Sequence, residues 1–98
     1  MQRDGLQRIV FYGVSEEMEV AYITLQGANL KLVGIVEDDE KFQPQIILGY
    51  ELEPVSRIKE LKPHAVLITS SAESDQKKGR LKTLIDMERI HVSDICLK

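Results

Sequence analysis

A glycine turn and an acidic run are the two features of this sequence whose residue types could bind a ligand. Gly13 follows an apolar run at residues 9–12 and precedes an amphipathic stretch at residues 16–26, the order strand, tight turn, helix. Such a turn directs backbone N–H groups and the positive end of a helix toward one point, where an anion can bind. Glu37 and Asp38 end a second apolar run, and Glu37 comes 24 residues after Gly13. Carboxylates near this spacing often accept hydrogen bonds from a ribose, so the two features together indicate binding of a nucleotide.

The glycine pattern of the turn is incomplete. A full dinucleotide fingerprint has glycines at its first, third and sixth positions, which here hold Gly13, Ser15 and Met18. Ser15 adds a side chain where a pyrophosphate approaches, although its hydroxyl could donate to a phosphate oxygen. Glu16 and Glu17 add negative charge at the same place. Two interpretations stay open: a turn that binds a ligand, and a strand-to-helix connection that binds nothing.

Ligand-binding residues are predicted at the turn and at the acidic run. At the turn they are Gly13, Val14 and Ser15. At the acidic run Glu37 is the first candidate for a ribose hydroxyl and Asp38 the second, while the alternative for residues 37–40 is a solvated loop. The run lacks the spacing of a calcium loop, so no metal site is predicted.

Hydroxyl groups follow the apolar run at residues 65–69. Thr69, Ser70 and Ser71 could contact a ligand or cap the next helix, and Ser70 is taken as a ligand-binding candidate. No G-x-S-x-G elbow surrounds them, which argues against a serine hydrolase.

The last predicted helix, at residues 74–85, is basic. Its cations could form a solvated face, or a surface for an acidic partner or a neighbouring subunit. They are Lys77, Lys78, Arg80 and Lys82.

No set of side chains in the sequence suits catalysis. The Tyr-x-x-x-Lys pair of short-chain reductases is missing, because the residues four positions after the three tyrosines are Glu16, Gln26 and Pro54. His64 and His91 lack the spacing of metal ligands, and Cys96 is the one cysteine. The chain is therefore expected to have no catalytic residues of its own.

The elements that must position these residues follow from the apolar runs. Runs at residues 9–12, 30–36, 46–48 and 65–69 are rich in Ile and Val and do not alternate with polar residues, which is typical of strands buried on both faces. Helices are predicted at residues 16–26, after Pro54 and at residues 74–85, and a last strand at residues 90–92. Leu52, Val55, Ile58 and Leu61 recur every third residue, and Pro63 ends this second helix.

The predicted order gives an α/β protein of three layers, with a mostly parallel sheet between helices on both faces. Right-handed crossovers predict the strand order 3-2-1-4, with the fifth strand beyond the fourth. Ligands of such sheets bind at the carboxyl ends of the strands where the order reverses, here between the first and fourth strands. The candidate residues of the turn and Ser70 would face this point, and Glu37 and Asp38 would flank it.

The composition of the chain limits its expected cellular location and the kinds of partner it can bind. The chain has 98 residues, enough for one domain, and a net charge of −3. Residues 16–60 hold ten Asp and Glu against four Lys and Arg, a balance of −6 that argues against nucleic-acid contact by this domain. A single cysteine and the lack of a signal peptide or apolar span predict a cytoplasmic protein without membrane contact. Residues 1–7 are expected to be a linker or a fragment boundary, so that residues 8–98 would be one domain of a longer protein.

Three stretches resemble a known family. The first is residues 9–13 and the third is residues 32–39. The second lies within residues 16–26 and consists of Glu16, Glu19 and the run Ala21-Tyr22-Ile23-Thr24-Leu25-Gln26. Over residues 8–95 the chain resembles the Rossmann-like CoA-binding domain of polysaccharide-biosynthesis proteins and nucleotide-sugar dehydratases. The version it resembles most follows a MarR-like winged-helix domain in bacterial transcription regulators of exopolysaccharide gene clusters.

The resemblance implies a Rossmann-like fold with Gly13–Ser15 at the phosphates and Glu37 or Asp38 at the ribose. The chain departs from the family in having Gly13-Val14-Ser15 for Gly-Ala-Gly and Glu37 for Asp. NAD, CoA or a nucleotide-sugar would be the ligand class.

Three functions follow as hypotheses. The first is a ligand-sensing regulatory domain of a bacterial transcription regulator. The second is a non-binding interaction module that holds subunits together, with a homodimer expected. The third is the N-terminal fragment of a nucleotide-sugar dehydratase or reductase, which would need a catalytic domain further along the chain.

Overall fold

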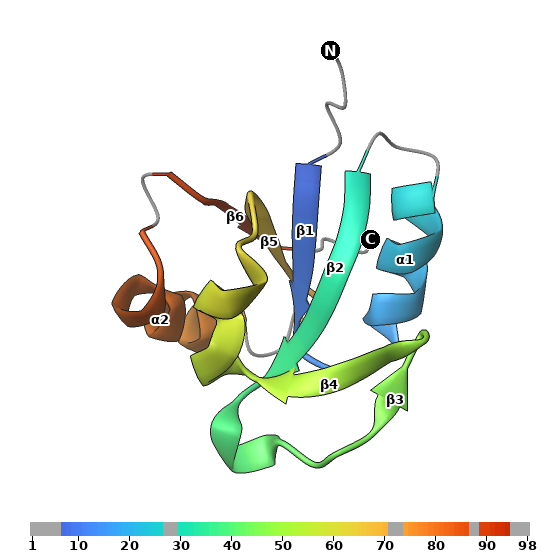
Figure 1. Cartoon of the computed structure of the whole chain (residues 1–98), viewed down its shortest axis with the longest axis horizontal. Coiled ribbons are helices and arrows are strands. Elements are labelled where there is room, and N and C mark those ends of the chain that lie inside the picture. Colours follow the sequence, from blue (N-terminus) through green and yellow to red (C-terminus); the bar gives the residue numbers. More distant parts are fainter. Residues whose placement is uncertain (1–6, 27–29, 71–73, 87–88, 95–98) are drawn as a thin grey trace.

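The computed structural model describes residues 7–26, 30–70, 74–86 and 89–94, which form one six-stranded sheet with helices around it (Figure 1). The strands are β1 (Gln7–Tyr12), β2 (Leu30–Glu37), β3 (Ile46–Ile47), β4 (Tyr50–Pro54), β5 (Ala65–Ile68) and β6 (His91–Asp94). The helices are α1 (Glu17–Gln26) and α2 (Ser74–Leu84), with 3-10 helices η1 (Asp39–Lys41) and η2 (Val55–Leu61). The strand order is β3-β4-β2-β1-β5-β6.

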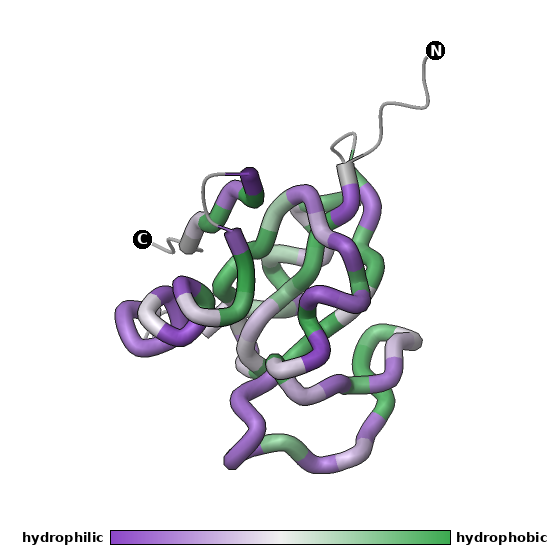
Figure 2. Tube along the Cα trace, turned by 60° about the vertical axis from the view of Figure 1, so that its left-hand side comes forward, coloured by the Kyte–Doolittle hydropathy of each residue, from purple (hydrophilic) through white to green (hydrophobic). Residues whose placement is uncertain are grey.

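The central strands are parallel and covered on both faces, which confirms the predicted three-layer α/β architecture. In β1, Ile9 and Phe11 face α1, where they pack with Met18, Ala21 and Leu25. The alternate side chains, Val10 and Tyr12, pack on the other face with side chains of η2 and α2. Both faces of β1 are therefore apolar, which explains why its sequence does not alternate. Figure 2 shows hydrophobic residues running through the middle of the molecule.

The predicted strand order is wrong at one edge. Residues 46–48 were expected to pair with β2, but β3 pairs only with β4, antiparallel, in the register Ile46↔Glu51 and Ile47↔Tyr50. The strand beside β2 is β4, parallel to it with Ile35 opposite Leu52. At the opposite edge β6 lies beyond β5, as expected.

The error has a physical cause in the residues after Gly49. The three-residue spacing of Leu52, Val55, Ile58 and Leu61 was taken for one helix, but it spans two elements. From Val55 to Leu61 it marks the 3-10 helix η2, whose three residues per turn bring every third side chain to the same side. Leu52 instead lies in β4, and its side chain is buried among those that face α1.

The bounds of two predicted helices can be compared with the structure, whereas two residues named in the sequence analysis lie outside the described ranges. The helices predicted at residues 16–26 and 74–85 agree with α1 and α2 to within one residue at each end. Ser71 and Cys96 lie outside the described residues. Among the described residues, none of the helices is both long and apolar enough to cross a membrane.

Candidate functional site

The structure brings the glycine turn and the end of β2 into direct contact. Gly13 follows β1, which lies beside β2, and its N–H donates to the carbonyl of Val36 at 2.9 Å. The next N–H, that of Val14, donates to Oε2 of Glu37 at 3.0 Å. Two groups of candidate residues, 24 positions apart in the sequence, therefore meet at the carboxyl end of the sheet, as the βαβ pattern predicted.

Glu37 is buried, and both of its carboxylate oxygens accept hydrogen bonds within the chain. Its side chain is 8% exposed. Oε2 takes the Val14 N–H, while Oε1 takes the Asp38 N–H at 2.9 Å and the ammonium of Lys77 at 3.0 Å. The expectation of a solvated loop is wrong for this residue. The carboxylate that was expected to hold a ribose already has three donors.

Lys77 reaches the site from α2 and is the cation that balances these acids. Its side chain is fully buried, and its ammonium lies 2.9 Å from Oδ2 of Asp38 as well as 3.0 Å from Glu37. The ammonium also lies 4.8 Å from the centre of the Tyr12 ring, a cation–π contact. A buried ammonium requires such partners because an isolated charge is costly away from water.

Asp38 links the buried pair to the surface. The hydroxyl of Tyr12 donates to Oδ1 of Asp38, and the Arg80 guanidinium lies 3.7 Å from the same oxygen. Arg80 also makes a bidentate ion pair with exposed Glu40, in which Nη1 donates to Oε1 at 3.1 Å and Nη2 donates to Oε2 at 3.0 Å. Burial alone would raise the pKa of Asp38, but hydrogen bonds from Tyr12 and Lys77 and the charges of Lys77 and Arg80 lower it below the usual value.

Tyr12 is held in its neutral form at this site. Burial, the hydrogen bond to Asp38 and the negative charge of Asp38 together raise its pKa well above the usual value for a tyrosine. The phenol therefore acts as a donor to Asp38 throughout the physiological pH range, and it does not supply a phenolate.

The gap between β1 and β5, where a ligand was expected, is bridged by the chain's own groups. Thr69 donates from its N–H to the Tyr12 carbonyl at 2.9 Å and from its hydroxyl to the Gly13 carbonyl. The hydroxyl of Ser15, which the sequence offered as a donor to a phosphate oxygen, donates to the Thr69 carbonyl. These bonds tie the turn after β1 to the end of β5.

Gly13 is required here by its backbone and by its neighbours. Its φ of +113° is one that L side chains rarely adopt. A Cβ added at Gly13 would lie 2.9 Å from Cε of Lys77 and 2.9 Å from Cβ of Ser70. The close approach that a glycine permits at this position is therefore made by Lys77 and Ser70 of the chain itself.

Sequence reasoning missed Tyr12 and Lys77, and it misjudged the basic helix. Lys77 is buried and does not belong to a solvated face, whereas Arg80 is exposed. Lys77 pairs with Glu37 and Asp38 at the end of β2. Arg80 lies near Asp38 and pairs with Glu40 in η1. A signal was present: Lys77 lies four residues before Leu81 and eight before Ile85, on the buried stripe of α2. A lysine on such a stripe, in a chain with an acidic run after a strand, indicates an internal ion pair.

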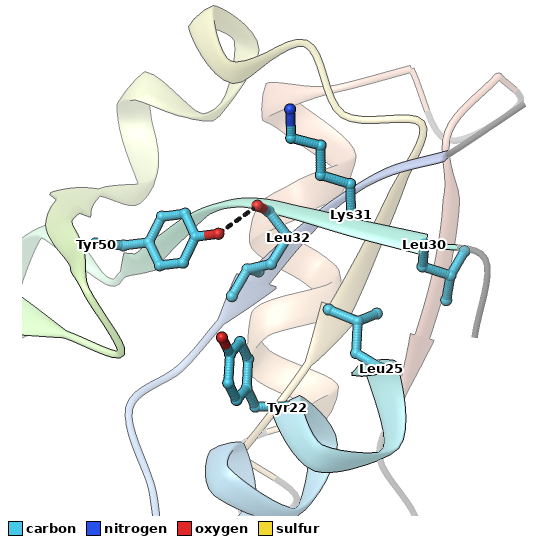
Figure 3. A pocket seen from close by; sticks show the side chains of 6 residues that line it. All are labelled: Tyr22, Leu25, Leu30, Lys31, Leu32 and Tyr50. Atoms are coloured by element: carbon cyan, nitrogen blue, oxygen red, sulfur yellow. Dashed lines mark hydrogen bonds between the residues drawn. The ribbon is translucent and has the colours of Figure 1, made fainter. Parts of the chain in front are cut away.

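Two hollows flank α1. One, of about 210 Å³, is lined by Tyr22, Leu25, Leu30, Lys31, Leu32 and Tyr50 (Figure 3). There the Tyr50 hydroxyl donates to the Leu32 carbonyl at 2.8 Å, at the half of β2 that extends past β4. The other hollow lies beside the glycine turn. Within the described ranges, no group of three or more His, Cys, Asp or Glu side chains is placed to hold a metal ion.

The parallel sheet with helices on both faces is a Rossmann-type α/β fold. The region where Gly13, Val14, Glu37, Asp38 and Lys77 meet corresponds to the ligand crevice of such folds and is called the crevice. Residues 5–91 match the family described as C2185-like, N-terminal, and the chain belongs to this family. The UDP-D-quinovosamine 4-dehydrogenase of Vibrio fischeri is similar in structure, with a TM-score of 0.69 and 19% identity over 94% of this chain and 80% of that one.

A second similar structure is that of RSP, a Rex-family repressor. The TM-score is 0.64 and the identity 12%, over 95% of this chain and 54% of the repressor, so this chain spans about half of the repressor's length. At these identities both likenesses show the fold alone. Among curated proteins, no sequence relative matches the chain.

Proposed function

We propose that this chain is a Rossmann-type regulatory domain of a cytoplasmic bacterial transcription regulator, and that it acts as an interaction module rather than as a dinucleotide sensor. It would carry no catalytic residues, touch neither nucleic acid nor membrane, and hold subunits together as a homo-oligomer. The resemblance to the exopolysaccharide regulators and the likeness in fold to a repressor support the regulatory setting.

The observation that carries this proposal is the closure of the crevice by Lys77. A bound dinucleotide needs a carboxylate for its ribose and an open turn for its pyrophosphate. Glu37 has its oxygens bound to Val14, Asp38 and Lys77, and the Lys77 stem lies against Gly13. To bind in the usual pose, a nucleotide would have to displace a buried ammonium and leave buried Glu37 without its cation, which is strongly unfavourable.

Exposed apolar side chains support the subunit contact. Ile46 on the edge strand β3 is 72% exposed, and Ile23 on the outer face of α1 is 71% exposed. Edge strands pair readily with other chains, and among the described strands β3 has a neighbour on one side only. Sedimentation of the protein at micromolar concentration tests this part, and a monomer at 100 µM would contradict it.

Ligand sensing remains the second candidate function, because one observation favours it. Five of the predicted ligand-binding residues gather around the crevice: Gly13, Val14, Glu37, Asp38 and Ser70. A sensor built on them would open by releasing Lys77 from the carboxylates.

Thermal unfolding separates the two functions. The protein is melted alone and with 1 mM NAD, NADH, CoA or UDP-glucose. A ligand bound with a Kd of 10 µM would add about 2.7 kcal/mol, which in a domain of this size raises Tm by more than about 10 °C. We expect a change below about 1 °C for every compound. An increase in Tm of several degrees with any one of these compounds would contradict the interaction module and support ligand sensing.

A further inference from the structure

A hollow of about 370 Å³ opens on the side of the glycine turn away from Lys77. Its wall comes from the turn and the start of α1 on one side and from β3 and the β3–β4 turn on the other. The lining residues are Val14, Ser15, Glu16, Met18, Glu19, Gln45, Ile47 and Leu48. Four of these eight side chains are apolar, so the hollow offers an apolar floor between two separate elements.

The hairpin that forms one wall is held in a defined shape. Leu48 and Gly49 form the two-residue loop between β3 and β4, with φ of 55° and 85°, as in the tight turns that favour hairpins. Ile47 and Leu48 pack against the cluster of side chains that includes Met18. The floor of the hollow is therefore anchored to the core, and it does not depend on a loose surface loop.

The charge of this hollow is negative and uncompensated. Glu16 and Glu19 are exposed, and neither carboxylate has a cation partner in the part of the chain that the structure describes. Two carboxylates outweigh the start of α1, whose dipole corresponds to only about +0.5 of a charge. A phosphate placed here would meet net repulsion.

Four backbone donors around the turn are already engaged within the chain. The N–H groups of Gly13 and Val14 donate to Val36 and Glu37, and those of Met18 and Glu19 donate back to carbonyls of Ser15 and Glu16. An anion would therefore find fewer donors here than at a complete phosphate-binding turn. The net negative charge of the hollow favours a ligand of the opposite sign.

We infer that this hollow binds a small organic cation with an aliphatic stem, an alkylammonium or alkylguanidinium compound. The cationic group would pair with Glu16 and Glu19 at the rim, and the stem would lie on Val14, Ile47 and Leu48. The volume falls within the range of small-molecule sites. This site is separate from the crevice closed by Lys77, and it does not rest on the proposed function.

A titration followed by amide NMR spectra tests the inference. Labelled protein is titrated with agmatine, and in parallel with glutarate, a dianion of similar length. We expect saturable shifts from agmatine at residues 14–19 and 45–48, none from glutarate, and an affinity that falls as NaCl rises from 20 to 300 mM, because the carboxylates are exposed.

A matched pair of variants decides whether these carboxylates carry the binding. E16Q/E19Q should raise the apparent Kd for agmatine at least tenfold. E60Q/D75N removes the same charge at exposed positions on η2 and α2 and should leave the Kd within twofold. Equal effects of the two variants, or agmatine shifts spread over the whole acidic surface, would overturn the inference. The nucleotide melting test does not depend on either outcome.

Discussion

The two sides of the glycine turn carry acidic side chains in opposite states. On the side of β2, Glu37 and Asp38 are largely buried and each is paired with Lys77. On the side of the β3–β4 hairpin, Glu16 and Glu19 are exposed and border an open hollow. The first set closes the position where a nucleotide binds in related folds, and the second set leaves a neighbouring position open to a cation.

The difference shows that burial, rather than residue type, decides what an acidic residue at a Rossmann turn does. A buried carboxylate must find donors within the protein because its loss of hydration is large. An exposed carboxylate keeps its water and remains free to meet a ligand. Carboxylates therefore close one side of the turn by pairing with Lys77, and on the other side they remain open to solvent and to a ligand.

Removing the ammonium of Lys77 should have the largest effect on the closed side of the turn, and so tests the difference between the two sides most directly. Lys77→Met should lower the free energy of unfolding by about 3–5 kcal/mol, because it leaves buried Glu37 without its cation and Asp38 with only the guanidinium of Arg80, 3.7 Å away. E16Q/E19Q, on the open side, should cost no more than about 1 kcal/mol, from the loss of charge at the start of α1. Urea unfolding measures both.

The outcome that would contradict this prediction is a similar cost on the two sides. If Lys77→Met does not fold, the double variant K77M/E37Q should fold and allow the measurement. The amide oxygen that replaces a carboxylate oxygen of Glu37 can still accept a hydrogen bond. The double variant should be more stable than K77M alone, which shows the coupling between the two side chains.

Adding a methyl group at Gly13 should have the next largest effect. Gly13→Ala places a Cβ 2.9 Å from Lys77 and from Ser70 at a φ of +113°, and should cost about 2–4 kcal/mol from backbone strain and overpacking. Gly79→Ala is the matched control in α2, where a Cβ meets open space and should add about 0.5–1 kcal/mol. Thermal unfolding of both variants gives the comparison, and a loss below about 1 kcal/mol at Gly13 would show that the Lys77 stem does not lie against the turn.

Acid should weaken the closed side by a smaller amount. The pKa of Asp38 is lower in the folded protein than in the unfolded chain, so its stabilisation is present at neutral pH and is lost as pH falls below about 4 through the folded value. Wild type should therefore lose more stability than Asp38→Asn between pH 5 and pH 3. Urea unfolding at pH 6, 5, 4 and 3 measures this, and parallel losses in the two proteins would show that Asp38 is not held by its partners.

Most of the elements could be predicted because their signals are local. The unbroken Ile and Val runs of β1, β2 and β5 reflect burial on both faces, and the stripe of Met18, Ala21 and Leu25 reflects the single buried face of α1. The position of β4 could not be predicted in this way. Tyr50–Pro54 is a short strand at the side of the sheet, and its apolar residue Leu52 continues the three-residue spacing of η2.

The candidate site could be located from the sequence, but its state could not. The βαβ pattern placed Gly13 and Val14 next to Glu37, and the structure confirms that contact. Whether Glu37 was free for a ligand depended on Lys77, which lies forty residues further along the chain. The stripe of Lys77, Leu81 and Ile85 indicates that this lysine faces the interior, but it does not say which acid the lysine meets, because that depends on how α2 packs across the end of the sheet.

The sequence alone thus determined the layers, the parallel core and the meeting of the turn with the acidic end of β2, since these follow from periodicity and chain connectivity. Only the tertiary structure decided that a cation of the chain itself fills that meeting point and that the neighbouring hollow lacks one among the described residues. The physical reason is that ion pairing of buried groups is a long-range property. It arises when helix packing removes water from both partners at once, and the local sequence of one partner does not identify the other.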